Sequence, residues 1–216
     1  MHILNILNEG KNHPIIVVDV QPTYCNNNVC EKIIQFVAQQ TGPVLMFVNA
    51  EQDGLTEDTI DTIKQYWEET LCDPEDMYDP ETDEYNECDA IDWSRFQIVD
   101  KGYGYLRPWM DEGEDPSTII KTIRAMYQQK VNDSRQLFNG EDSPNYEEQM
   151  NNLLGNNNGA FKDDPISVEW TSIKQLKQFN GAYIVGGSRD ECLREVELLM
   201  NAFNIKYKRI DSLVYE

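Results

Sequence analysis

The sequence predicts a three-layer α/β/α fold with a mostly parallel central sheet. Short apolar runs alternate with amphipathic helical patterns along the 216 residues, an order that is typical of βαβ units. The first run, residues 14–20, is rich in β-branched side chains, as expected of a strand that is buried on both faces. With 40% hydrophobic and 10% aromatic residues, the chain can build the core that such a sheet needs.

Five segments have the composition of strands, and five have the 3.6-residue periodicity of helices. The predicted strands cover residues 14–20, 43–49, 96–99, 182–186 and 205–209. The predicted helices cover residues 30–38, 57–71, 117–138, 168–179 and 191–203. We expect the second helix to start at Thr56, which precedes acidic residues of a first helical turn. Because there is no internal repeat, we expect a single domain over residues 1–216.

Two stretches interrupt the alternation of strands and helices. Residues 72–94 form an acidic excursion, in which ten carboxylates and no Lys or Arg lie between Asp73 and Asp92. This composition predicts an exposed loop. Residues 102–165 form an enlarged insertion, with a helix over about 117–138 and a loop over 139–165 that is rich in Asn, Gly, Asp and Pro.

The net charge of −21 is concentrated in one region of the chain. Residues 57–116 hold 20 acidic and 4 basic side chains, which gives this region a net charge of −16. A surface of this charge repels phosphate groups, so we expect no direct nucleic-acid binding and no docking on anionic membranes. The charge instead favours a basic protein as a partner.

Cysteine spacing and motif searches point away from disulfides, metals and cofactors. The five cysteines are odd in number and form no CxxC pair, so we expect neither a disulfide framework nor a zinc site. The carboxylates from Asp79 onward alternate as in an EF-hand loop, but Glu84 stands where that loop needs Gly. No dinucleotide fingerprint, P-loop, signal peptide or membrane span is present. We therefore expect a cytoplasmic protein without a cofactor or metal.

Candidate catalytic residues follow the ends of three predicted strands. In parallel sheets, ligands bind beyond the carboxyl ends of the strands. Asp19 follows the first strand, Lys101 follows the third, and Cys192 lies in the first turn of the helix after the fourth. Backbone N–H groups and the helix dipole favour a thiolate at such a cysteine and an oxyanion beside it. Asp19 is placed to exchange the thiol proton, and Lys101 to support the thiolate.

The same residues resemble the motifs of the isochorismatase-like cysteine hydrolase superfamily. The matching features are a strand that ends in Asp19-Val-Gln21, the central Lys101, and a turn of six residues from Gly186 that leads to Cys192. The resemblance covers about residues 14–50, 95–105 and 166–210, and each motif alone is weak. Details near Trp109 are similar to bacteriophage-encoded branches, which implies the host cytoplasm as the location of a viral member.

The resemblance implies a fold, a mechanism and a substrate class. The fold is the Rossmann-like isochorismatase fold. Cys192 is the implied nucleophile, Asp19 the general base and acid, and Lys101 the residue that orients Asp19 and stabilises the thiolate. The implied reaction is hydrolysis of a C–N bond in a small amide or ureido compound through a thioester, and cleavage of an isochorismate-type vinyl ether is an alternative. The implied assembly is a homo-oligomer. Candidate substrate contacts are Gln21, Tyr103, Trp109, Gly187 and Arg189.

A second interpretation belongs to a different class of function. Taken singly, Asp19 is typical of a helix cap, and Cys192 shares an apolar stripe that is typical of a structural cysteine. Arg189 stands where the family usually has a small or hydroxyl residue, next to the oxyanion turn. The alternative is therefore a catalytically inactive protein of this fold whose acidic surface, residues 57–116, binds a basic partner protein as a nucleic-acid mimic.

Overall fold

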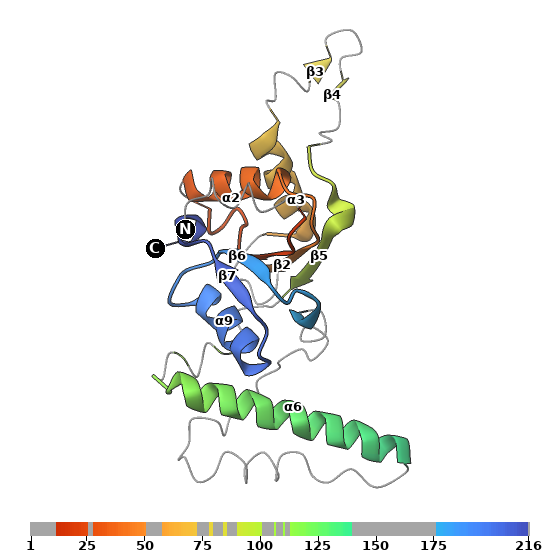
Figure 1. Cartoon of the computed structure of the whole chain (residues 1–216). Helices are drawn as coiled ribbons and strands as arrows, with labels where there is room; N and C mark the ends of the chain where they lie inside the picture. The colour runs from red at the N-terminus through yellow and green to blue at the C-terminus, as the bar shows by residue number, and fades with distance from the viewer. Residues whose placement is uncertain are drawn as a thin grey trace.

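A five-stranded parallel sheet forms the centre of the protein in a computed structural model (Figure 1). Its strands, in the order β5-β2-β1-β6-β7, are Phe96–Asp100, Val44–Val48, Ile15–Val18, Ala182–Gly186 and Tyr207–Arg209. The structure describes residues 12–25, 28–50, 58–72, 78–79, 84–85, 90–100, 106, 110, 113–139 and 176–215. Every predicted strand is present within one or two residues of its expected bounds, and each pair of neighbours is parallel.

The order of the strands reverses beside β1. The chain adds β2 and then β5 on one side of β1, and later adds β6 and then β7 on the other side. Val18, the last residue of β1, is paired with Phe47 of β2 and Gly186 of β6. The carboxyl ends of β1 and β6 therefore meet at the switch point of the sheet, where open α/β sheets bind their ligands.

Helices cover both faces of the sheet (Figure 1). Side chains from alternate positions of β1, such as Ile16 and Val18, pack in one core with α6 (Pro116–Asn139) and α9 (Cys192–Ala202). The intervening positions, Ile15 and Val17, pack in a second core with α2 (Asn28–Ala38) and α3 (Ile60–Leu71). This alternation follows from the period of two in a strand, and it explains why the central strands are apolar throughout. The predicted α/β class is confirmed.

Helix α3 begins later than the sequence predicted. Thr59 is its N-cap, and it forms a capping box with Thr62, whose main-chain N–H donates to the Thr59 hydroxyl at 3.0 Å. Thr56 therefore does not start the helix. The preceding residue, Asp58, is 6% exposed and accepts hydrogen bonds from Gln21 and Thr23. A tertiary contact thus helps to set the start of α3, because the carboxylate of Asp58 is hydrogen-bonded to the residues that follow β1.

The described parts of the acidic excursion contain a short antiparallel pair. Strand β3 (Tyr78–Asp79) pairs with β4 (Glu84–Tyr85), and both lie away from the central sheet in Figure 1. The excursion returns through the 3₁₀ helix η2 (Trp93–Arg95), where the indole of Trp93 donates to Glu68 of α3 at 2.6 Å. An aromatic and hydrogen-bonded contact therefore anchors the returning end of an excursion that the sequence predicted only as a loop.

Helix α6 confirms the helix predicted over about 117–138 and packs against α9. The Arg124 guanidinium donates to the main-chain oxygens of Ala202 at 2.6 Å and Asn201 at 3.0 Å. A cation at this place satisfies carbonyl groups that the end of α9 leaves without helical partners. The predicted loop lies outside the described residues from position 140 onward, as does most of the helix predicted over 168–179.

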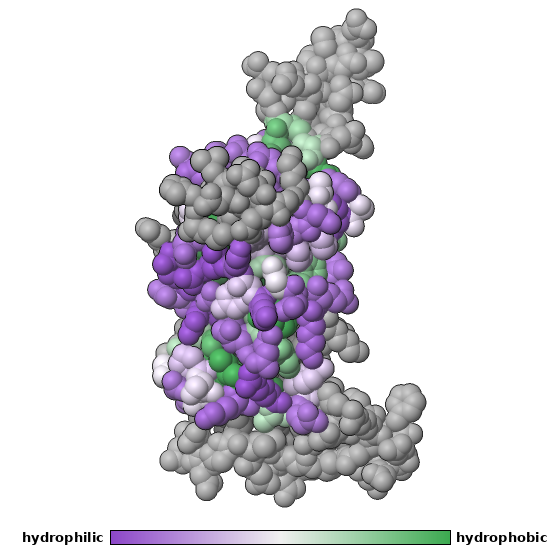
Figure 2. Space-filling view, in the orientation of Figure 1, coloured by the Kyte–Doolittle hydropathy of each residue, from purple (hydrophilic) through white to green (hydrophobic). Residues whose placement is uncertain are grey.

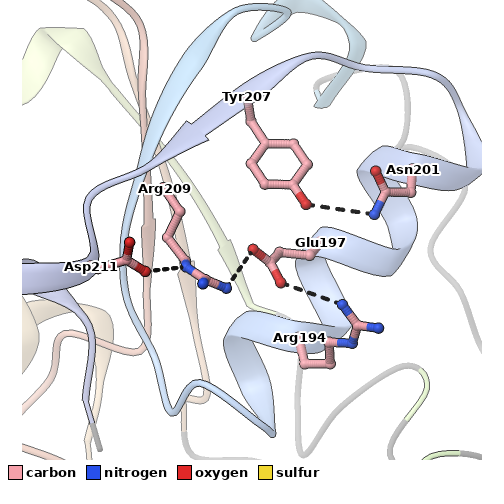
Figure 3. Close-up of polar contacts among 6 residues, drawn as sticks. All are labelled: Arg194, Glu197, Asn201, Tyr207, Arg209 and Asp211. Atoms are coloured by element: carbon pink, nitrogen blue, oxygen red, sulfur yellow. Dashed lines mark hydrogen bonds and ion pairs between the residues drawn. The ribbon is translucent and has the colours of Figure 1, made fainter. Parts of the chain in front are cut away.

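Ion pairs join α9 to the edge strand β7 (Figure 3). Glu197 is 4% exposed, and its carboxylate contacts the guanidinium groups of Arg209 at 3.1 Å and Arg194 at 3.7 Å. Arg209 also donates to Asp211 at 2.7 Å, and this hydrogen bond lowers the pKa of the Asp211 carboxyl. The buried charge of Glu197 is thus paired on two sides, as a carboxylate in this position requires.

The visible surface of the described residues is largely hydrophilic (Figure 2). Hydrophobic side chains reach it in small areas, and Ile60 is the exposed large hydrophobic residue within the described part of the chain. None of the helices described here has the length and apolar composition that crossing a membrane requires.

Replacing Gly186 with Ala tests the close approach of β6 to β1. A β-carbon at this position would lie 2.3 Å from the Val18 carbonyl oxygen, and the φ angle of +78° already favours glycine. We expect Gly186→Ala to lower the free energy of unfolding by about 3 kcal/mol or more in urea denaturation. Gly181→Ala is the matched control, because Gly181 has a φ of +88° but no atom within 4 Å of its β-carbon position. Equal losses in the two variants would contradict this account.

Candidate functional site

Asp19 lies at the switch point, directly after β1. Its side chain is buried, with 2% of the residue exposed, and its φ angle of 49° is in the left-handed region. The main-chain N–H of Asp19 still donates to Phe47 of β2 at 2.9 Å, so the residue is the first to leave the ladder. A non-glycine residue in this conformation is uncommon, and such residues are concentrated at functional sites.

Two glycines shape the turn that follows β6. Gly186 and Gly187 have φ angles of +78° and +65°, and a β-carbon on Gly187 would lie 3.0 Å from both the Leu193 nitrogen and a Val18 methyl group. The turn therefore passes between the end of β1 and the start of α9 with no room for side chains. These distances show that Gly187 is needed for close packing of the turn. Its predicted contact with a substrate stays a prediction.

Cys192 is the first residue of α9 and lies immediately after this turn. It carries a thiol, not a disulfide, and is partly buried against the core that α6 and α9 share. The N–H of Leu193 donates to the Ser188 carbonyl at 3.1 Å, which closes the turn on the helix. The structure thus confirms the predicted position of Cys192 in the first turn of a helix, where N–H groups and the helix dipole favour a thiolate.

Tyr215 connects the two sides of the switch point and was not among the predicted site residues. Its main-chain N–H donates to Gly187 at 3.0 Å, and its carbonyl accepts from the N–H of Arg189 at 3.3 Å. Its hydroxyl donates to the main-chain oxygen of Asp19 at 3.2 Å. One residue therefore contacts both the turn before Cys192 and the backbone of Asp19.

Burial and neighbouring negative charges keep the Tyr215 phenol protonated. Burial raises the pKa of this phenol well above its usual range, and the negative charge of Asp19 raises it further, as do charges on Tyr66 and Cys192. The phenol is therefore neutral at physiological pH and acts as a hydrogen-bond donor. Asp19 and Cys192 thus both contribute to the electrostatic environment of this phenol.

Gln21 joins the ends of β1 and β2 and is fully buried. Its amide oxygen accepts the N–H of Asn49 at 2.9 Å, and its amide nitrogen donates to the Asn49 carbonyl and to Asp58, both at 2.8 Å. The Gln21 amide therefore bonds to the Asn49 backbone as a neighbouring strand would, and so extends the hydrogen-bonded ladder between β1 and β2. Gln21 was predicted to contact substrate, and its described contacts are all with the protein.

The structure brings some of the other predicted residues close to the site and leaves others undescribed. Arg189 is exposed, and its positive charge contributes to the lowered pKa of Asp211 after the larger effect of Arg209. Its side chain therefore does not fill a buried pocket. Lys101, Tyr103 and Trp109 lie outside the described residues.

The chain after Lys101 returns to the helix that begins with Cys192. Strand β5 ends at Asp100, which is paired with Val48 at the same edge of the sheet as Asp19. Five residues after Lys101, the N–H of Leu106 donates to the carboxylate of Glu195, which is 2% exposed. Glu195 lies one helical turn after Cys192. This contact makes Glu195 a structural anchor for Leu106.

Disulfide bonding of Cys25, Cys30 and Cys72 contradicts the expectation that the chain has no disulfide framework. Cys25 and Cys30 are joined, with their α-carbons 5.7 Å apart. The turn after β1 brings them together, because the N–H of Cys25 donates back to Gln21 at 3.0 Å while Cys30 lies in the first turn of α2. The Tyr215 hydroxyl lies 3.2 Å from the Cys30 sulfur and 3.5 Å from that of Cys25. The disulfide thus adjoins the candidate site.

Within the described part of the chain, no group of three or more His, Cys, Asp or Glu side chains is arranged to hold a metal ion. Two acidic residues of α9 have protein partners, since Glu195 accepts from Leu106 and Glu197 pairs with arginines. The chemistry that this arrangement can support is therefore that of a buried carboxylate and a thiol at a helix start.

Replacing Gln21 with Ala tests the link between β1 and β2. The change leaves the buried N–H and carbonyl groups of Asn49 without their partner and removes one donor from Asp58. We expect Gln21→Ala to lower the free energy of unfolding by about 2–4 kcal/mol in urea denaturation. Gln35→Ala, on the exposed face of α2, is the matched control and should change stability by less than about 0.5 kcal/mol. A Gln21→Ala protein as stable as this control would show that the link is dispensable.

Peptide mapping without reductant tests the disulfide. We expect the peptide that contains Cys25 and Cys30 to carry no alkyl group on either sulfur, while Cys192 in the same unfolded sample is alkylated. Because the bond closes a short loop, its reduction should lower the free energy of unfolding by about 2 kcal/mol. Alkylation of both Cys25 and Cys30 in the unreduced protein would contradict the pairing.

Comparisons with known proteins assign no family to this site. No family model, no curated protein and no solved structure matches the chain. The chemistry of the site therefore depends on Asp19, the glycine turn, Cys192 and Tyr215, which the central sheet positions.

Proposed function

We propose that the protein is a cysteine hydrolase of the isochorismatase-like kind that cleaves a C–N bond in a small amide or ureido compound. The observation that supports this most is the position of Asp19 and Cys192. They follow the adjacent strands β1 and β6 at the switch point of the sheet, and the Tyr215 phenol is influenced by the charge of both. Buried carboxylate and thiol groups in this relation are the parts that acyl transfer requires.

In the proposed reaction, Cys192 attacks the carbonyl carbon of the substrate while Asp19 takes up the thiol proton. The carbonyl oxygen gains the negative charge, which main-chain N–H groups at the start of α9 stabilise. Collapse of this intermediate breaks the C–N bond, and Asp19 returns the proton to the leaving nitrogen. Water then attacks the thioester with Asp19 as base, which releases the acid and restores the thiol. Lys101 is proposed to stabilise the thiolate and to orient Asp19.

Three features support a catalytic role over a purely structural one. Asp19 has a left-handed backbone and a buried side chain, a combination that costs stability unless the surrounding structure holds it. The side chain of Arg189 is exposed, so it does not occupy the interior of the turn before Cys192. Leu106, five positions after Lys101, donates to Glu195 and so lies against the helix that carries Cys192.

Turnover of a panel of small amides and ureido compounds tests the proposal. We expect Cys192→Ala to lower kcat by about a thousandfold or more for any compound that the wild-type protein hydrolyses, because the nucleophile is lost. Asp19→Asn should cause a loss of similar size. Asp61→Asn, which changes an exposed carboxylate on α3, is the matched control and should keep full activity.

Circular dichroism should show that the variants are folded. Mass spectrometry of wild-type protein quenched during turnover should detect an acyl group on Cys192. Full turnover by folded Cys192→Ala protein would refute the proposal. A wild-type protein that hydrolyses no member of the panel and captures a basic protein in a salt-dependent manner would favour the inactive, acidic scaffold instead.

A further inference from the structure

Tyr215 is held between the turn after β6 and the end of β1 by contacts from its backbone and its side chain. It forms an isolated parallel bridge with Ser188, and its backbone exchanges hydrogen bonds with Gly187 and Arg189. Its ring is 8% exposed and ends at a hydroxyl that donates to the Asp19 carbonyl at 3.2 Å. These contacts fix the phenol relative to both halves of the site.

We propose that Tyr215 is a positioning residue that holds the Asp19 carboxylate in its working relation to Cys192. This inference rests on the proposed function, because it assigns Tyr215 a role beside the two proposed catalytic residues, Asp19 and Cys192. The hydroxyl contacts the backbone of Asp19, not its carboxylate, so it fixes the direction in which that side chain leaves the chain. Its own backbone is tied to the turn that carries Cys192.

The strain at Asp19 explains why such a contact is needed. A left-handed φ is strained in a residue other than glycine, and Asp19 has a φ of 49°. The N–H of Asp19 is held by Phe47 and its carbonyl by Tyr215, so the residue is fastened on both sides of its strained torsions. Loss of the hydroxyl frees the carbonyl, and the backbone of Asp19 can then relax and carry the carboxylate away from Cys192.

The disulfide makes the position of the phenol well defined. The sulfurs of Cys25 and Cys30 lie 3.5 Å and 3.2 Å from the Tyr215 hydroxyl oxygen. Cys30 is fully buried in the first turn of α2. The hydroxyl therefore lies between the disulfide and the Asp19 carbonyl. Among these contacts, the Asp19 carbonyl is the main-chain acceptor for its proton.

The pH at which Cys192 forms its thiolate depends on how close the Asp19 carboxylate lies, and it can be measured without a substrate. A nearby carboxylate opposes formation of the thiolate, and only the thiolate reacts with iodoacetamide. Tyr215 is neutral at physiological pH, so Tyr215→Phe removes a donor and no charge. The other charged groups of the turn and the first turn of α9 stay the same in every variant: Arg189, Asp190, Glu191 and Glu195.

The experiment measures the rate of iodoacetamide labelling of Cys192 against pH, with peptide mapping to isolate this cysteine. We expect Asp19→Asn to move the midpoint of labelling to lower pH, because it removes the opposing charge. Tyr215→Phe should move it in the same direction and raise the rate at neutral pH by about threefold. In protein that already carries Asp19→Asn, Tyr215→Phe should have no further effect, because both changes act through one carboxylate.

Tyr207→Phe is the matched control. The Tyr207 hydroxyl also contacts α9, through Asn201 at 3.5 Å (Figure 3). Asn201 lies near the opposite end of the helix from Cys192. Burial raises the pKa of this phenol as well, so it too is neutral, and its oxygen accepts from the Asn201 amide. We expect Tyr207→Phe to leave the labelling midpoint of Cys192 unchanged, whether or not Asp19 is intact.

Two results would overturn the positioning role. One is a folded Tyr215→Phe protein whose Cys192 labels as in the wild type. The other is a shift of the same size in the presence and absence of Asp19→Asn, which would show a path other than the carboxylate. Labelling needs no hydrolysis, so failure of this inference is distinct from failure of the proposed function, which the turnover of Cys192→Ala decides.

Discussion

Gly186 allows strand β6 to lie so close to β1 that a β-carbon in its place would stand 2.3 Å from the Val18 carbonyl oxygen. This close contact occurs at the last paired position of the two strands, where the order of the sheet reverses. The residues just beyond, Asp19 on one strand and Gly187 on the other, are therefore neighbours. The turn from Gly187 leads directly into α9, and so the same contact sets where Cys192 begins its helix.

The loop after β1 is held by one of its own side chains, Gln21, and by two side chains from distant parts of the chain. Gln21 ties it to Asn49 and Asp58, the Trp67 indole donates to the Val20 carbonyl at 2.8 Å, and Tyr215 donates to Asp19. Each is a buried hydrogen bond whose loss leaves a polar group without its partner. A strained residue can persist only where its surroundings hold it in this way, and Asp19 meets that condition.

Local patterns in the sequence predicted the strands and most helices because β-branched runs and helical stripes are local signals. They also indicated Asp19 and Cys192, since both follow strand ends. The pattern did not reveal Tyr215, because only the packing of η3 (Asp211–Leu213) and the residues after it brings the phenol back to β1. The Cys25–Cys30 pair was missed because it depends on how the turn after β1 folds. The start of α3 was predicted too early because Asp58, just before the Thr59 cap, is hydrogen-bonded to that turn. Lys101 stays a prediction.

The central claim is that the β1–β6 contact places a carboxylate and a thiol in one site. A crystal structure at neutral pH measures this most directly, through the distance from the Asp19 carboxylate oxygens to the Cys192 sulfur. The account predicts a separation of roughly 6 Å or less, the range over which such groups influence each other's ionisation. A Cys192 sulfur turned into the core between α6 and α9, beyond that range from Asp19, would contradict it.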